Sequence, residues 1–319
     1  MNKETIQSNI HLADKNWFQT GGNAKFYSKP ASTQEFQETI IFANNNKLEP
    51  FILGAGANIL ISDDGFDGLV IHPHMQQMTH EPYDEKHAVV HAQAGVQIED
   101  LIDYCLDNNI IGLEEFSGIP GTVGGSLYIN IHYFSFFLSD FLVGATVIDR
   151  FTGKIKQVDK QWFKFGYDTS KLFEKKYYLL QASFKLKKAS EHETYFAKGR
   201  NVEIIRHRNA RYPTSHTCGS FFRNFHDHEV ELFIDGTNKK MIYVAYYLDK
   251  LGVKGHLKEG DAVVSHKHAN MIVNKGNATS TDIVTLAKKM QLLAKENFGI
   301  VPQAECQLIG FKAYPLLRT

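Results

Sequence analysis

The sequence predicts a mixed α+β protein built from more than one domain. Strand-like and helix-like segments alternate along the first half, and the pattern restarts beyond a polar, charged stretch at residues 187–200. At 319 residues the chain is too long for one small domain. Its 43% hydrophobic and 12% aromatic residues suffice for sizeable cores, which excludes a generally disordered protein. We expect a boundary near residue 190.

The first-half helices are indicated by capping and spacing. Ser32, with Glu35 three residues later, forms a capping-box pattern ahead of an apolar helical face that ends at residues 44–46. Residues 98–106 carry the i, i+3, i+4, i+7 stripe of an amphipathic helix. Strands are expected at residues 51–53, 59–62, 69–71, 87–94 and 177–186, and a hairpin at 145–149 and 154–158.

The second half repeats this mixture. Residues 241–251 look helical and end at Gly252, and residues 279–297 form the clearest helix of the chain, with a Ser/Thr cap. Short apolar runs at 262–264 and 271–273 predict strands.

Charge and cysteine usage exclude several classes of protein. Thirty-five basic and 35 acidic residues give zero net charge, so a broad nucleic-acid or membrane-surface footprint is not expected. Three dispersed cysteines without a CxxC pattern argue against a disulfide scaffold and a zinc knuckle. The N-terminus lacks a signal-peptide core, and polar residues interrupt the longest apolar stretch, 129–148. We therefore expect a soluble, cytoplasmic protein.

Two segments rich in small residues are candidates for ligand binding. GAGAN at residues 54–58 leads into a strand rather than a helix, which argues against a Rossmann fingerprint but still allows an anion-binding nest. The loop 117–125 carries four glycines and one proline, so a flat ligand or a phosphate can approach it closely. Plain structural turns remain alternatives for both segments. Their separation favours one extended ligand, such as a dinucleotide, touching both.

Several short motifs follow one another along the chain in a recognisable order: GGNA at 21–24, GAGANIL at 54–60, DGFDG at 64–68, GIPGTVGG at 118–125, CGSFFRN at 218–224, HKHANMIVN at 266–274, and Glu305 ahead of LIG at 308–310. In this order they resemble the UDP-N-acetylenolpyruvoylglucosamine reductase family, flavoenzymes of peptidoglycan precursor synthesis. The short gap between residues 167 and 220 resembles the family's more compact class.

The resemblance implies a fold and a set of ligands. It implies two FAD-binding subdomains of the vanillyl-alcohol-oxidase type, at 1–72 and 73–190, and a C-terminal α/β substrate-binding domain at 191–319. It further implies non-covalent FAD, NADPH as co-substrate, a UDP-sugar substrate, no metal and a monomer. The implied cofactor-binding residues are Gly54, Ala55, Gly56, Ala57, Asn58, Ile59, Gly118, Pro120, Gly121, Thr122, Gly124, Gly125 and Asn130. The implied substrate-binding residues are Tyr167, Arg211, Arg223, Asn224 and Asn270.

The resemblance also implies a reaction. A hydride passes from NADPH through the flavin to an enolpyruvyl double bond, and the resulting enolate is protonated at the neighbouring carbon. Ser220 is the implied proton donor, and Glu305 the implied assistant at the enol oxygens. Serine is a poor acid, so Ser220 needs a stabilising environment, for which Gly219, Arg223 and Lys267 are candidates.

The chain departs from the family pattern at three places. Asp168 stands where the family has a catalytic arginine, and a lost stabiliser of that kind typically costs about 10²–10³ in rate. Lys171 and Arg206 are candidate replacements. Residues 131–137 (IHYFSFF) replace a run of small residues, which either narrows the flavin channel or repacks a loop. Gln307 stands where arginine is common.

These departures keep two other readings open. The chain is either the active reductase, a diverged flavoprotein with another substrate, or a non-catalytic binder of FAD or nucleotide sugars. Histidine pairs at 226/228 and 266/268 have the i, i+2 spacing of some metal sites, but no nearby cysteine or carboxylate completes a ligand set.

Overall fold

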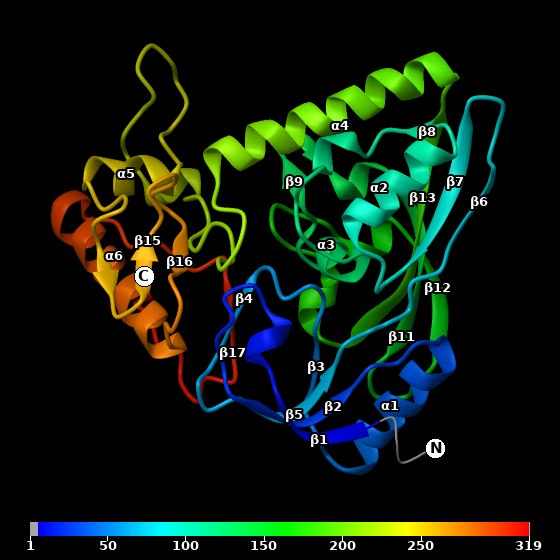
Figure 1. Cartoon of the computed structure of the whole chain (residues 1–319), viewed down its shortest axis with the longest axis horizontal. Coiled ribbons are helices and arrows are strands. Elements are labelled where there is room, and N and C mark those ends of the chain that lie inside the picture. Colours follow the sequence, from blue (N-terminus) through cyan, green and yellow to red (C-terminus); the bar gives the residue numbers. More distant parts are fainter. Residues whose placement is uncertain (1–5, 319) are drawn as a thin grey trace. The chain divides into compact units, whose positions relative to one another are not determined.

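The computed structural model describes residues 6–318 and confirms the mixed helix and strand content (Figure 1). Its contacts divide the described chain into two compact units. The first unit holds residues 6–10, 25–55 and 67–208, and the second holds 11–24, 56–66 and 209–318. The segment 54–58 is thus shared between them. No described helix is both long and apolar enough to cross a membrane.

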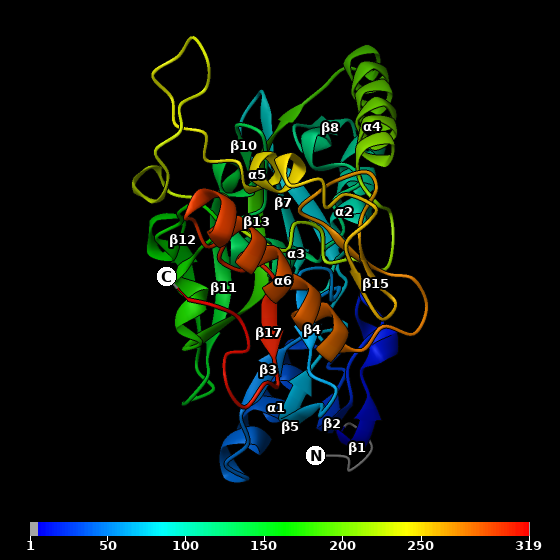
Figure 2. The ribbon, with the colours of Figure 1, turned by 90° about the vertical axis from the view of Figure 1, so that its left-hand side faces the viewer.

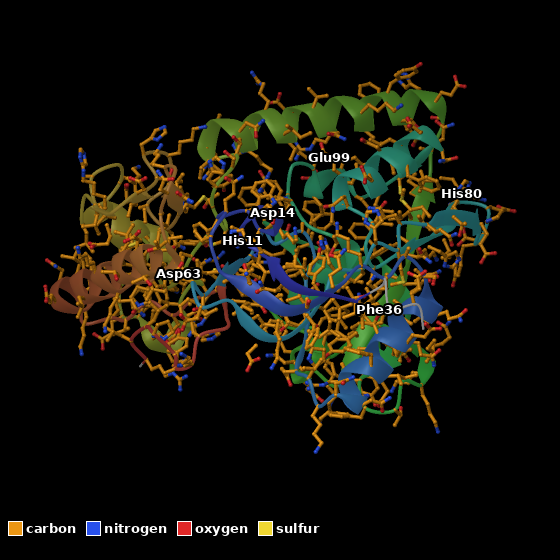
Figure 3. The ribbon with its side chains drawn as sticks, turned by 60° about the horizontal axis from the view of Figure 1, so that its bottom comes forward. His11, Asp14, Phe36, Asp63, His80 and Glu99 are labelled. Carbon is orange, nitrogen blue, oxygen red and sulfur yellow. The ribbon has the colours of Figure 1, made fainter. Side chains whose placement is uncertain are left out.

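The first unit contains a four-stranded sheet covered by helix α1 (Thr33–Asn45). The strand order is β1 (Ile6–His11), β2 (Asn23–Ser28), β5 (Phe66–Ile71), β3 (Pro50–Ile52), with β3 parallel to β5. The Ser32 side chain accepts a hydrogen bond from the Glu35 amide, which confirms the predicted cap, and Phe36 on the inner face of α1 is fully buried (Figure 3).

A six-stranded sheet forms the rest of that unit. The order is β12 (Ile155–Asp159), β11 (Leu142–Asp149), β13 (Tyr177–Lys188), β7 (His87–Gln93), β6 (Met78–Pro82), and β8 (Ile110–Ile111) also pairs with β13. The predicted hairpin is confirmed, since Ile148 pairs with Ile155. Helices α2 (Ile98–Asp107) and α4 (Glu191–Arg211) run side by side, and Lys198 on α4 contacts Asp107 at 2.9 Å (Figure 1). Residues 187–200 therefore complete β13 and begin α4.

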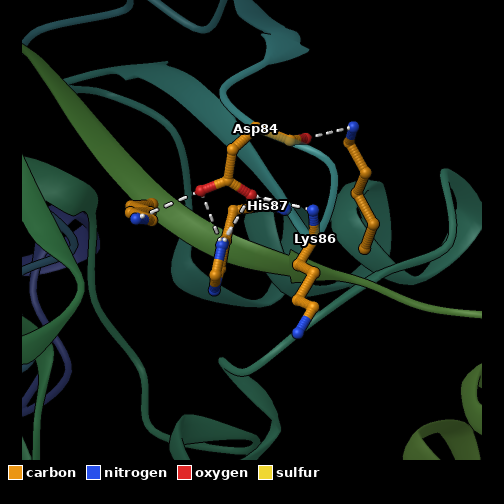
Figure 4. A network of polar contacts seen from close by, with 5 residues as sticks. Asp84, Lys86 and His87 are labelled. Atoms are coloured by element: carbon orange, nitrogen blue, oxygen red, sulfur yellow. Dashed lines mark hydrogen bonds and ion pairs between the residues drawn. The ribbon is translucent and has the colours of Figure 1, made fainter.

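The turn between β6 and β7 is held by Asp84 (Figure 4). Its carboxylate accepts hydrogen bonds from the backbone amides of Lys86 and His87 and from the His87 ring, and it lies 3.4 Å from Lys185 Nζ. Desolvation alone would raise the pKa of Asp84, but these hydrogen bonds outweigh it and lower the pKa to about 2.

The prediction of a loop over residues 117–125 is wrong for its last three residues, which are helical. Val123 already begins helix α3 (Val123–Ile129), and the Thr122 hydroxyl caps it by accepting a hydrogen bond from the Gly125 amide. Two consecutive glycines disfavour a helix on propensity alone. Tertiary contact overrides that preference, because a Cβ on Gly124 would lie 3.1 Å from the Ala94 carbonyl oxygen. Close packing against the end of β7 thus selects glycine here.

The second unit is smaller and contains two short sheets. Strands β14 (Lys258–Glu259), β15 (Ala262–Val264) and β16 (Ile272–Asn274) are antiparallel, and helices α6 (Ser280–Phe298) and α5 (Val244–Lys250) pack nearby (Figure 2). Strand β17 (Gln307–Ile309) pairs in parallel with β4 (Ile59–Ile61). The predicted helix at 279–297 is confirmed, whereas the one at 241–251 begins only at Val244, because the Met241 amide instead donates to the Leu232 carbonyl.

Helix α6 begins on a carboxylate from another part of the chain. Asp63, labelled in Figure 3, accepts hydrogen bonds from the backbone amides of Ser280 and Thr281 and from the Thr281 hydroxyl. Burial alone would raise the pKa of Asp63, but these hydrogen bonds outweigh it and the pKa is lowered. The anion also complements the positive end of the helix dipole.

We expect Asp63→Ala to lower the free energy of unfolding by about 1–2 kcal/mol, as for loss of a helix cap. Urea denaturation measures it. Because the folded-state pKa of Asp63 is lowered, its contribution is present above the ordinary aspartate pKa and disappears as the pH falls through the lowered value. Asp64→Ala is the control. The Asp64 side chain is 70% exposed, and its ion pair with Lys312, at 3.3 Å, is a surface pair that contributes little to stability. Equal loss in both variants would contradict the capping role.

Candidate active site

The two segments rich in small residues meet within the first unit. A Cβ added to Gly54 would lie 2.7 Å from the Thr122 hydroxyl oxygen and 3.8 Å from the Gly125 Cα. Gly54 follows β3, and Thr122 precedes α3. A side chain at position 54 would fill this cradle, so glycine keeps it open.

The first segment offers backbone donors. Its carbonyls are held by other parts of the second unit, since the Trp17 amide donates to Gly56 and the Gln307 amide to Asn58. By contrast, no amide of residues 54–58 donates a hydrogen bond within the described chain. Gly56 has φ +68°, and a Cβ there would lie 2.5 Å from the Lys15 carbonyl oxygen. Successive unused amides in a small-residue bend suit an anionic ligand.

The second segment has few backbone amides left for a ligand, because most of them are already hydrogen-bonded within the protein. The Val123 amide donates to Val96, the Gly124 amide to Ala94, and the Gly125 amide to the Thr122 hydroxyl. What the second segment can still offer is room for a ligand to come close to the backbone at Gly121 and Thr122. One polar atom beside it has no partner in the described chain: the buried hydroxyl of Ser126, 2.9 Å from where a Cβ on Gly121 would lie. Sequence reasoning missed Ser126, although it directly follows the glycine pair.

Asn130 links this cradle to the loop that carries Asp168. Asn130 ends α3 in the left-handed conformation (φ 53°). Its side chain donates to the Gly166 carbonyl at 3.0 Å and accepts from the Ser139 amide at 3.2 Å. Ser170 adds a hydrogen bond to the Tyr128 carbonyl at 2.7 Å. A seven-residue helix spans about 10 Å, so the cradle and this loop occupy opposite ends of one rigid element.

Two of the departures from the family pattern contact each other. His132, from the aromatic run that forms the small hairpin β9 (His132–Tyr133) and β10 (Phe136–Phe137), places Nδ1 3.4 Å from the Asp168 carboxylate. Its ring lies 4.5 Å from that of Tyr167 and stacks on Phe137 at 5.2 Å between ring centroids. Burial lowers the pKa of His132, so the imidazole is neutral at neutral pH.

The two suggested replacements for the arginine lie elsewhere in the first unit. Lys171 places its ammonium 4.7 Å from the centre of the Trp162 ring, and the exposed Arg206 pairs with Glu203 at 2.9 Å. His132 places its Nδ1 3.4 Å from Asp168, and sequence reasoning missed this contact because the two residues are 36 positions apart.

Ser220 and Glu305 lie on paired segments of the second unit. The Phe221 carbonyl accepts hydrogen bonds from the Glu305 and Cys306 amides, and Phe222 forms a bridge with Ala304. The Ser220 hydroxyl makes no hydrogen bond within the described residues, so it is available to a ligand. Burial raises the pKa of the neighbouring Cys218 thiol well above its ordinary value, which favours the neutral thiol.

The same region connects to the first glycine segment. Gln307 begins β17, and its amide donates to the Asn58 carbonyl. Glu305 is two residues earlier, so its Cα lies at most about 7 Å from that of Gln307. The parallel pairing of β17 with β4 therefore brings Glu305 toward Asn58, the last residue of the GAGAN segment. The side-chain oxygen of Asn58 is buried and has no hydrogen-bond partner in the described chain.

Most of the predicted substrate-binding side chains already contact other groups of the protein. Asn270 bridges the backbone N–H and C=O of Phe222 with its side chain and thereby holds the Ser220 segment. Arg223 forms a two-pronged ion pair with Glu229 and also donates to the Asn224 carbonyl. Arg211 is exposed, with its guanidinium 5.6 Å from the Tyr212 ring centre.

The cations suggested to assist Ser220 also have partners. Lys267 donates to the backbone carbonyls of Asn209 and Tyr212, at the end of α4, and Arg223 is held as described above. Burial, with Arg211 and Lys254 nearby, lowers the pKa of His268 to about 4. Over residues 6–318 no three His, Cys, Asp or Glu side chains form a group that could hold a metal.

Comparison with known proteins decides the family. An FAD binding domain model matches residues 24–159, and a model of the UDP-N-acetylenolpyruvoylglucosamine reductase C-terminal domain matches 211–309. A UDP-N-acetylenolpyruvoylglucosamine reductase of Listeria innocua is 31% identical over 306 residues, which cover 96% of this chain and 95% of that protein. The chain belongs to the UDP-N-acetylenolpyruvoylglucosamine reductase family.

Other members agree with this assignment. The reductase of Chloroherpeton thalassium is 31% identical over 307 residues, covering 96% of this chain and 94% of that protein. The crystal structure of the reductase from Thermus caldophilus matches with a TM-score of 0.74 at 24% identity, covering 94% of this chain and 97% of that one. The expected fold, a flavin-binding fold of the vanillyl-alcohol-oxidase type with a C-terminal domain, is confirmed.

The residues present fit FAD. A dinucleotide diphosphate requires donors and close backbone approach, and the cradle supplies both: unused amides in the first segment, and a gap at Gly54 that a Cβ would fill. Within the first unit, Gly54, Ala55, Gly121 and Thr122 would be the residues available to hold the diphosphate. The orphaned hydroxyl of Ser126 is a further candidate contact.

Proposed function

We propose that this protein reduces UDP-N-acetylglucosamine enolpyruvate to UDP-N-acetylmuramate, with NADPH as reductant and non-covalent FAD as cofactor. The reaction belongs to peptidoglycan precursor synthesis in the cytoplasm. The observation that carries the proposal is the meeting of the two small-residue segments at Gly54 and Thr122 in a chain of this family.

Bound FAD supplies the hydride carrier between NADPH and the enolpyruvyl double bond. Ser220 delivers the proton to the carbon next to the one that receives the hydride, and Glu305 stabilises the charge on the enol oxygens. Their segments are hydrogen-bonded to each other through Phe221, which supports a shared role. Asn270 is a positioning residue, because it holds the backbone of Phe222 and touches no group proposed to react.

The domain boundaries and binding residues are part of the same proposal. Residues 1–72 and 73–190 form the two FAD-binding subdomains, and residues 191–319 the substrate-binding domain, in a monomer. Tyr167, Arg211, Arg223 and Asn224 contact the UDP-sugar. Tyr167 is half exposed, as a substrate contact requires. The ion pair with Glu229 holds the Arg223 side chain in one orientation beside the proposed substrate.

A second candidate function is reduction of a different substrate by the same flavin site. The contact between His132 and Asp168 favours it, because a neutral imidazole beside a carboxylate offers no fixed positive charge to a substrate carboxylate.

Two half-reactions measured without oxygen separate these functions. The purified protein is expected to be yellow, NADPH to bleach it, and UDP-N-acetylglucosamine enolpyruvate to restore the colour. Bleaching without restoration by this substrate would point to the second candidate. A colourless protein that does not bind added FAD would remove both.

Asp168→Arg is expected to slow colour restoration by about tenfold rather than accelerate it. The half-buried His132 Nδ1 lies 3.4 Å from the Asp168 carboxylate and makes no hydrogen bond in the described chain, so the longer arginine side chain would have to displace this ring, and such overpacking costs about 1–3 kcal/mol. Stopped-flow absorbance measures the rate. Asp67→Arg is the matched control, because the Asp67 side chain is 87% exposed and its ion pair is with the exposed Lys25. Faster restoration in Asp168→Arg would show instead that the native aspartate is a handicap.

A further inference from the structure

The last turns of α4 pack directly on the second small-residue segment. Gly118 has φ +71°, and a Cβ there would lie 3.4 Å from Ile205 Cγ1 and 3.5 Å from Arg208 Cδ. Arg208 Nε donates a hydrogen bond to the Gly118 carbonyl at 3.2 Å. Helix α4 thus contacts the loop that runs into the Thr122 cap of α3.

The same side chain also contacts the segment that follows α3. The Arg208 guanidinium lies 5.5 Å from the centre of the Tyr133 ring, which is buried, and the Tyr133 hydroxyl lies 3.2 Å from His207 Nδ1. Arg208 therefore touches the chain on both sides of α3, before it at Gly118 and after it at Tyr133.

Other basic side chains of α4 have a different role. Lys198, Arg200 and Arg206 pair with the carboxylates of Asp107, Glu115 and Glu203, at 2.9–3.0 Å. Such exposed pairs contribute little to stability. Arg208 is half-buried and donates to the backbone carbonyl of a glycine in the left-handed region, and glycine loses more conformational entropy on ordering than other residue types do.

From this geometry we propose that Arg208 is a positioning residue for the cofactor, which fixes the loop from Gly118 to Thr122 in its binding conformation before FAD arrives. The C-terminal end of this loop is held separately, since Thr122 bridges Gln97 and accepts from the Gly125 amide and the Gly121 carbonyl accepts from Ile98. At its N-terminal end the Ile119 amide donates to the Phe116 carbonyl, and Arg208 is the side chain that binds Gly118. Ordering a loop in advance increases affinity because binding no longer carries the entropic cost. The proposal needs FAD binding but not the identity of the reduced substrate.

The test is FAD titration of the deflavinated full-length chain, followed by quenching of flavin fluorescence. Arg208→Leu keeps most of the apolar stem but removes the donor, and we expect the dissociation constant to rise about tenfold, as for one lost hydrogen bond. Arg206→Leu is the matched control, since among the described residues this exposed side chain pairs with Glu203 alone, and its dissociation constant should stay within about twofold of wild type.

Hydrogen exchange of the unmodified, FAD-free protein supplies a second measurement that needs no variant. The Ile119 amide, which donates to the Phe116 carbonyl inside this loop, should be protected before FAD is added. Exchange there as fast as in an unstructured chain would overturn the proposal, as would unchanged FAD affinity in Arg208→Leu. Failure of the wild-type protein to bind FAD would instead remove the function proposed above.

Discussion

Ser220→Ala is expected to slow reoxidation of the flavin by substrate by about 10²–10⁴-fold, the range for loss of a positioned proton donor. Reduction by NADPH should be unchanged, because the hydroxyl is proposed to act only after the hydride has reached the substrate. The Ser220 hydroxyl makes no hydrogen bond within residues 6–318, so its removal breaks no described contact. Stopped-flow measurement of both half-reactions gives the two rates.

Ser215→Ala is the control for this variant. Ser215 lies in the same unit, five residues earlier, and is exposed. It should leave both half-reactions unchanged. An equal loss of both rates in Ser220→Ala would show that the hydroxyl supports the structure and is not the proton donor.

Gly54→Val is expected to weaken FAD binding by about 10- to 100-fold, which corresponds to the 1–3 kcal/mol cost of forcing extra atoms into a packed site. The new Cβ would lie 2.7 Å from the Thr122 hydroxyl oxygen, and the two γ-methyl groups would extend further into the cradle. The fraction of protein purified with bound flavin, and the dissociation constant after deflavination, measure the effect.

Gly199→Ala on α4 is the matched control, because no atom lies within 4 Å of a Cβ placed there. It should bind FAD as the wild type does. Normal flavin content in Gly54→Val would mean that the meeting of the two segments is not the FAD site, and the function proposed here would lose its main support.

Much of the local structure follows from the sequence. The Ser32 cap starts α1, the apolar stripe at 98–106 forms α2, and Thr279 caps α6. These predictions succeeded because capping and helical periodicity depend on residues within one or two turns of each other. The family was also determined by the sequence, since its motifs recur in order along the chain.

Only the tertiary structure decided how distant segments are used. The amides of Val123 and Gly124 look available in the sequence, yet carbonyls of the turn that follows β7, at Val96 and Ala94, accept their hydrogen bonds. Strand β17 pairs with β4 across nearly 250 residues, and His132 meets Asp168 across 36. Residue type reports local preference, whereas hydrogen-bond pairing and burial between distant segments depend on the whole packed fold.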